Sequence, residues 1–64
     1  MKLSPNEQKT MRALAAGLLA PEIAARHGWA ENAPHIYAHR AKRKLRCRTR
    51  TQAVVKFMLN EGAT

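Results

Sequence analysis

The segment from Ala33 to Arg50, APHIYAHRAKRKLRCRTR, constrains the fold more than any other part of this chain. Seven of its last eleven residues are Lys or Arg, and none of its residues is acidic. One helix face carries Pro34, Tyr37, Ala41 and Leu45, because these residues follow one another at intervals of three or four positions. The other face carries His35, Ile36, His39, Arg40 and Arg43. A helix with one packing face and one basic face is typical of proteins that read a DNA groove.

Length and charge support this interpretation. The chain has 64 residues, which indicates one small domain spanning residues 1–64. A domain of this size buries only about 60% of the surface that its unfolded chain exposes, so a partner chain would stabilise it. The 12 Lys and Arg residues against 4 acidic residues give a formal net charge of +8. Such a charge steers a protein toward polyanions, with nucleic acid the first candidate and an anionic membrane surface the second.

Cysteine content and hydropathy suggest where the protein works. Cys47 is the only cysteine, so neither an intramolecular disulfide nor a cysteine-based zinc site can form within the chain. No apolar run approaches the ~20 residues of a membrane span, and the N-terminus lacks the apolar core of a signal peptide. We therefore expect a cytoplasmic, nucleoid-associated protein that does not contact membranes.

The start of the chain predicts a capped helix. Ser4 is a good N-cap, Pro5 suits the first helical position, and Glu7 can reach back to the Ser4 backbone to complete a capping box. This helix is expected to run to about Ala16, with Gly17 supplying a left-handed stop.

Two further helices follow. Residues 21–27 predict a short helix that Gly28 ends, and Trp29 is expected to fill the corner after it as a core residue. The basic helix then spans about residues 33–45, with Asn32 as its cap, because a proline deep inside a helix would disrupt it.

The last helix carries more apolar surface than a monomer needs. Thr49 and Gln52 predict a capping box that opens a helix from about Arg50 to Asn60, which Gly62 closes. One apolar stripe would suffice for a monomer, so the excess predicts a symmetric homodimer. The predicted dimer residues are Val54, Val55, Met58 and Leu59. Alternatively, Val55 and Leu59 are simply exposed aliphatic side chains.

These elements predict an all-α fold, a four-helix (tetrahelical) helix-turn-helix domain. The chain resembles the C-terminal DNA-binding domain of the LuxR/NarL/GerE family, in its stand-alone GerE-like form, from Leu3 to about Gly62. The residues that carry this resemblance are Leu3, Ser4, Pro5, Glu7, Ala15, Gly17, Leu18, Glu22, Ile23, Ala24, Gly28, Glu31, Lys44, Leu45, Arg50, Gln52 and Ala53.

The resemblance implies a dimeric transcription regulator whose third helix, about residues 33–45, enters the major groove of double-stranded DNA. It implies that His35, Ile36 and His39 contact base edges. Arg40 is the residue best able to form two hydrogen bonds with one guanine. Phosphate contacts are expected from Arg43, Lys44, Arg48 and Arg50. The chain departs from the family pattern at Leu19, Pro21, Ala33, Pro34, His35, Tyr37 and Arg46, the last of which replaces a usual glycine.

Other interpretations of these residues are weaker. His35 and His39 have the spacing of two helical zinc ligands, but no third ligand is evident, so we expect no metal or other cofactor. His27 is expected to be half-buried, and Cys47 to fill a small core space. The chain has no aspartate and no phosphate-binding loop, which argues against an enzyme. The alternative function is a regulator that binds a larger LuxR-type protein, or another protein partner, with weak or no specific DNA binding.

Overall fold

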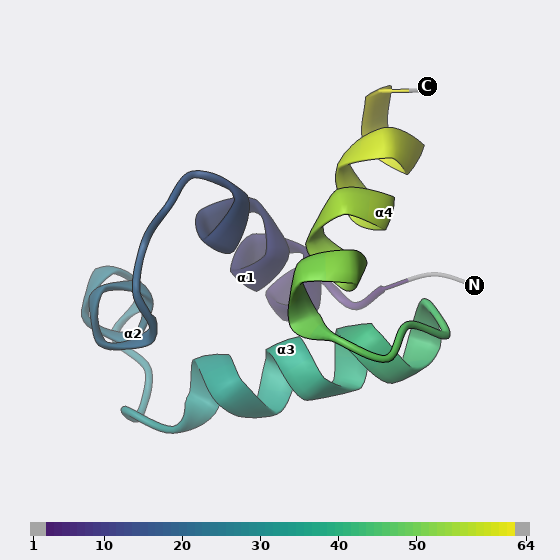
Figure 1. Ribbon diagram of the computed structural model, residues 1–64. Helices are drawn as coiled ribbons and strands as arrows, with labels where there is room; N and C mark the ends of the chain where they lie inside the picture. Colours follow the sequence, from purple (N-terminus) through teal and green to yellow (C-terminus); the bar gives the residue numbers. More distant parts are fainter. Residues whose placement is uncertain (1–2, 63–64) are drawn as a thin grey trace.

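The computed structural model describes residues 3–62 and contains four helices within that range: α1 (Pro5–Ala15), α2 (Ala20–His27), α3 (Ala33–Lys44) and α4 (Arg50–Gly62). The predicted all-α fold is confirmed. Figure 1 shows α3 running along the base of the molecule, with α1 and α4 above it and α2 beside its first turn. One side of α3 is therefore covered by the other helices.

Local hydrogen bonds begin α1 and α4 as the sequence predicts. The Glu7 backbone N–H donates to Ser4 Oγ at 3.3 Å, and the Ser4 N–H donates to Glu7 Oε1 at 2.8 Å. At α4, the Gln52 N–H donates to Thr49 Oγ1 at 3.1 Å, and the Thr49 N–H donates to Gln52 Oε1 at 3.3 Å. Both capping boxes are confirmed, and each satisfies backbone donors that have no partner inside the helix.

The starts of α2 and α3 differ in detail from the predictions. Helix α2 begins at Ala20, one residue early, where Glu22 Oε1 accepts from the Leu19 N–H at 2.8 Å. Helix α3 begins at Ala33 after Asn32, as predicted, but the Asn32 side chain makes no capping hydrogen bond. Its ψ of −8° is helical, whereas a capping side chain requires the extended backbone typical of an N-cap.

Helix α1 ends in a left-handed turn at Gly17, as predicted. Gly17 has φ of 90°, its N–H donates to the Leu14 carbonyl at 3.0 Å, and the Leu18 N–H donates to the Ala13 carbonyl at 3.1 Å. This pattern is a Schellman motif, which favours glycine because a Cβ is disfavoured at positive φ. Gly28 ends α2 in the same way, with φ of 69°.

Helix α3 ends in the same motif but without a glycine. Arg46 has φ of 57° and is the one non-glycine residue with positive φ in the described range. Its N–H donates to the Arg43 carbonyl at 3.1 Å, and the Cys47 N–H donates to the Lys42 carbonyl at 3.0 Å. A left-handed conformation costs a residue with a Cβ about 1–2 kcal/mol, so this turn retains backbone strain.

We expect Arg46→Gly to raise the free energy of unfolding by about 0.5–1 kcal/mol, because glycine relieves the strain but gains entropy in the unfolded chain. Chemical denaturation monitored by circular dichroism measures the change. The control is Arg46→Ala, which also removes the charge but keeps the Cβ and should give no such gain. Equal effects of the two substitutions would contradict the backbone explanation.

The core joins α1, α3 and α4 around small residues. Its buried cluster consists of Leu3, Met11, Ala38, Ala41, Leu45, Ala53 and Phe57. The alanines let the helices approach closely, because their side chains add little thickness at the contact. Cys47 packs half-buried against this cluster, as predicted for a small core filler.

Candidate nucleic-acid interface

Helix α3 has the two faces that its sequence predicts. Its core side includes Pro34, Ala38, Ala41 and the capping residue Leu45, all of them buried, with Tyr37 half-buried beside them. On its other side, five side chains are exposed: His35, Ile36, His39, Arg40 and Arg43. Ile36 keeps 42% of its surface exposed and is the one aliphatic side chain among these five.

Aromatic packing holds the N-terminal end of α3. The His27 and Trp29 rings stack with centroids 4.5 Å apart, and Trp29 meets Tyr37 edge-on at 4.9 Å. Asn6 Nδ2 donates to the Tyr37 hydroxyl at 3.2 Å, which links this cluster to α1. His27 is half-buried, as predicted, whereas Trp29 fills the corner after α2 but stays half-buried outside the core cluster. The turn between α2 and α3 is thus fixed from both sides.

An ion pair holds the other end of α3. Lys44 Nζ lies 2.8 Å from Glu7 Oε1, and the Glu7 side chain is only 3% exposed. Burial by itself would raise the pKa of Glu7, but the hydrogen bond and charge of Lys44, together with hydrogen bonds from Ser4, outweigh it and lower the pKa. Glu7 therefore has two tasks, capping α1 and binding the last residue of α3.

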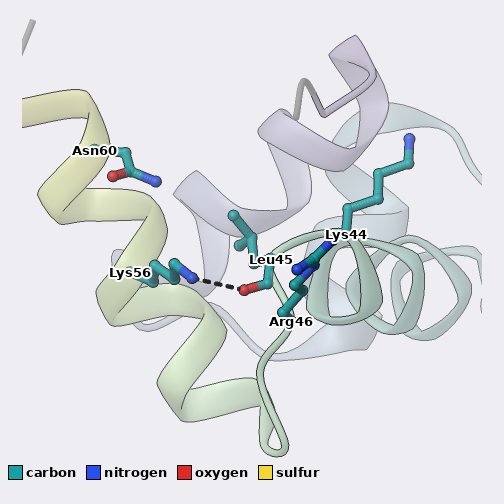
Figure 2. Close-up of a pocket in the computed structure, with 5 residues that line it drawn as sticks. All are labelled: Lys44, Leu45, Arg46, Lys56 and Asn60. Atoms are coloured by element: carbon teal, nitrogen blue, oxygen red, sulfur yellow. Dashed lines mark hydrogen bonds between the residues drawn. The ribbon is translucent and has the colours of Figure 1, made fainter.

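A second lysine stabilises the carbonyl end of α3. Lys56 Nζ donates to the Leu45 carbonyl oxygen at 2.9 Å, as Figure 2 shows. A cation at this position complements the negative end of the helix dipole. The hollow around this bond measures about 300 Å³ and is lined by Lys44, Leu45, Arg46, Lys56 and Asn60. Both of its lysine ammonium groups bind acceptors within the protein.

Lys44 is less exposed than the other residues predicted to contact phosphate. Arg43, Arg48 and Arg50 are exposed, whereas Lys44 is partly buried and paired with Glu7. The sequence did not predict this pairing, because 37 residues separate the two partners. A phosphate contact by Lys44 stays a prediction, and it would have to compete with Glu7.

A hollow of about 340 Å³ lies where α3 meets the start of α4. Its lining residues are His35, Ala38, His39, Lys42 and Arg50. The fold thus brings Arg50 beside two predicted base-reading histidines. Lys42 was not assigned a DNA contact from the sequence, although its spacing from His35 and His39 is that of one helix face. Only the position of α4 shows that Lys42 also lies beside Arg50.

The outer side of α4 is apolar and exposed. Val55 is 53% exposed, Met58 45% and Leu59 70%. Val54, the fourth predicted dimer residue, is instead partly buried against the protein's own core. Three of the four residues thus remain accessible in the monomer.

Comparison with known protein families, like the basic exposed face of α3, points to nucleic-acid binding. Residues 1–57 match the family model described as bacterial regulatory proteins, luxR family. The chain belongs to the LuxR family. Members of this family are DNA-binding transcription regulators with an all-α helix-turn-helix domain. No curated protein sequence and no solved structure gives a significant match to the chain.

The LuxR-family match covers every residue predicted to contact DNA. It also covers Val54 and Val55 in α4, whereas Met58 and Leu59 lie beyond it. Arg46, which stands where the resemblance leads us to expect glycine, adopts the left-handed conformation that glycine favours. The turn after α3 thus has a backbone conformation that would suit a glycine at this position.

Within residues 3–62, no group of three or more His, Cys, Asp or Glu side chains is placed to hold a metal ion. None of the described helices is long and apolar enough to cross a membrane.

Proposed function

We propose that this protein is a sequence-specific transcription regulator that binds double-stranded DNA as a homodimer, with α3 in the major groove. The main support is the exposed face of α3, which combines hydrogen-bonding, apolar and cationic side chains on a helix held at both ends. No acidic residue occurs between Asn32 and Asn60, so no side chain of α3 itself would repel a phosphate.

The exposed residues divide into two roles in this proposal. His35 and His39 form single hydrogen bonds with base edges, Ile36 packs against a thymine methyl group, and Arg40 makes a forked contact with guanine. Arg43, Arg48 and Arg50 bind phosphates, with a weaker contribution from Lys44 because Glu7 holds its ammonium group. Arg50 lies beside His35 and His39, which supports simultaneous contacts with a base and the adjacent backbone.

Selection from a pool of randomised duplexes tests the proposal. We expect enrichment of an inverted repeat, because a twofold-symmetric dimer presents two copies of α3 to two half-sites. Binding of the selected duplex should weaken steeply as salt rises, since phosphate contacts release counterions. A selection that enriches no sequence, combined with no binding in dilute buffer, would contradict the proposal.

The homodimer has its own test in Val55→Asp combined with Leu59→Asp. A charge on each protomer within an apolar contact is strongly unfavourable, so we expect the mass in sedimentation equilibrium to fall to that of one chain. Both side chains are exposed in the monomer, so the helical circular dichroism should remain. The matched control is Asn60→Asp, which adds charge to α4 away from this stripe. An unchanged mass of the double variant would discard the α4 interface.

The alternative function is regulation through a protein partner, including a larger LuxR-type protein that pairs through α4. The same salt titration separates the two functions, because a protein partner bound through the apolar surface of α4 would not give the counterion dependence of DNA binding. The exposed Val55, Met58 and Leu59 suit either a homodimer or such a pair.

A further inference from the structure

A second cationic surface lies away from α3, in a hollow between α1 and α2. The hollow measures about 310 Å³, which is the size of a small binding pocket. Three cationic side chains line it: Lys9, Arg12 and Arg26. Three apolar residues also line it: Ala13, Ala16 and Leu18. The ring of His27 completes the lining, and Leu19, the next residue after Leu18, is 68% exposed.

This hollow lies on the side of α1 that faces away from the core. The buried residues of α1 are Glu7, Thr10 and Met11, and Glu7 is paired with the last residue of α3. Lys9 and Ala16 lie about half a helical turn from that buried face, by the 3.6-residue period of the helix. The DNA-reading face of α3 and this hollow therefore occupy different sides of the molecule, so occupying one leaves the other accessible.

We propose that the hollow between α1 and α2 is a docking site for an acidic amphipathic helix of a partner protein. The apolar residues of the hollow would receive one or two aliphatic side chains of that helix, and the cationic residues would bind carboxylates on either side of them. Among the described residues, no ion pair involves Lys9 or Arg26, so their charges are available to an incoming carboxylate. This proposal does not depend on DNA binding.

The composition of the hollow favours a protein helix over a nucleic acid. Binding of a phosphate backbone depends on densely placed cations and is not strengthened by an apolar surface. A helix with both aliphatic and acidic residues can instead contact the apolar and the cationic residues of the hollow. The cations from α3 to the first residue of α4 are the denser group, with seven Lys and Arg residues from Arg40 to Arg50. Arg12 is also partly engaged within the domain, since its guanidinium lies 5.8 Å from the centre of the Phe57 ring.

The test uses a synthetic peptide of about 16 residues with leucines along one face, glutamates on either side of them and alanines at the remaining positions to favour a helix. We expect it to bind the full chain in a fluorescence titration, and its contacts to appear at the amides of Ala13, Leu18 and His27 in NMR spectra. Lys9→Gln combined with Arg26→Gln should weaken binding about fivefold, since each exposed ion pair contributes modestly. Circular dichroism should show that the variant remains folded.

Three controls make the result decisive. A peptide of the same composition with scrambled leucines should bind at least fivefold more weakly; equal binding would show general attraction between opposite charges and overturn the proposal. Arg43→Gln combined with Arg48→Gln removes two charges elsewhere and should leave peptide binding unchanged. A peptide that a DNA duplex displaces in direct competition would place its site on α3 and also overturn the proposal. Because the titrations need no DNA, failure of DNA binding would not affect them.

Discussion

Replacing both Arg40 and Arg43 with alanine is expected to weaken binding to duplex DNA by about 30-fold to 100-fold in dilute buffer, or roughly 2–3 kcal/mol. Both side chains are exposed on the face of α3 that the core leaves uncovered. Among the described residues, neither takes part in an ion pair, and neither belongs to the hydrophobic core. Their loss should therefore change DNA affinity without changing the fold, which circular dichroism would verify. Fluorescence anisotropy with a labelled duplex measures the affinity.

The salt dependence distinguishes the two arginines. Loss of a phosphate contact should reduce the slope of log affinity against log salt by about one, whereas loss of a base contact should relax sequence preference. We expect Arg43→Ala to give the first result and Arg40→Ala the second. The matched control is Lys9→Ala combined with Arg26→Ala, which removes the same charge on the far side of α1. If the control weakens binding as strongly as the α3 variant, net charge and not the α3 surface would account for the binding.

The second large effect is on stability: Lys44→Met is expected to lower the free energy of unfolding by about 2–3 kcal/mol. The substitution keeps the length and apolar stem of the side chain but leaves the buried Glu7 carboxylate without its cation. A small domain has only about 3–5 kcal/mol of stability, so most of it would be lost. Chemical denaturation measures the change.

The double variant Glu7→Gln/Lys44→Met provides the control for this effect. Glutamine can still accept the capping hydrogen bond from Ser4, and no buried charge remains, so the double variant should be more stable than Lys44→Met alone. If the double variant were the less stable of the two, the ion pair would not be the cause.

The pH dependence of stability follows from the same pair. Because the pKa of Glu7 is lowered in the folded protein from its ordinary value of 4.5, its contribution to stability is fully present above pH 4.5. This contribution is lost as the pH falls through the folded value. In Lys44→Met the burial remains while the lysine is gone, so the folded pKa of Glu7 should rise toward its unfolded value and the loss of stability on acidification should become smaller. Identical pH profiles for the two proteins would contradict this assignment.

Local signals predicted most helix boundaries because the interactions that set them span only a few residues. The capping boxes at Ser4 and Thr49 and the stop at Gly17 form between residues three to five positions apart, so their sequences suffice. The same reasoning was wrong about the Asn32 side chain. There the helical backbone conformation of Asn32 prevents the hydrogen bond, and the residue type alone does not determine that conformation.

The sequence by itself determined the four helices, the all-α class and the division of α3 into a core face and an exposed face. Those features depend on periodicity, capping and charge, which act within one helix. Only the tertiary structure showed that Glu7 binds Lys44, that Arg50 lies beside His35 and His39, and that α1 and α2 enclose a second cationic hollow. These contacts join residues far apart in the chain, and their formation depends on how the helices pack, which no local pattern encodes.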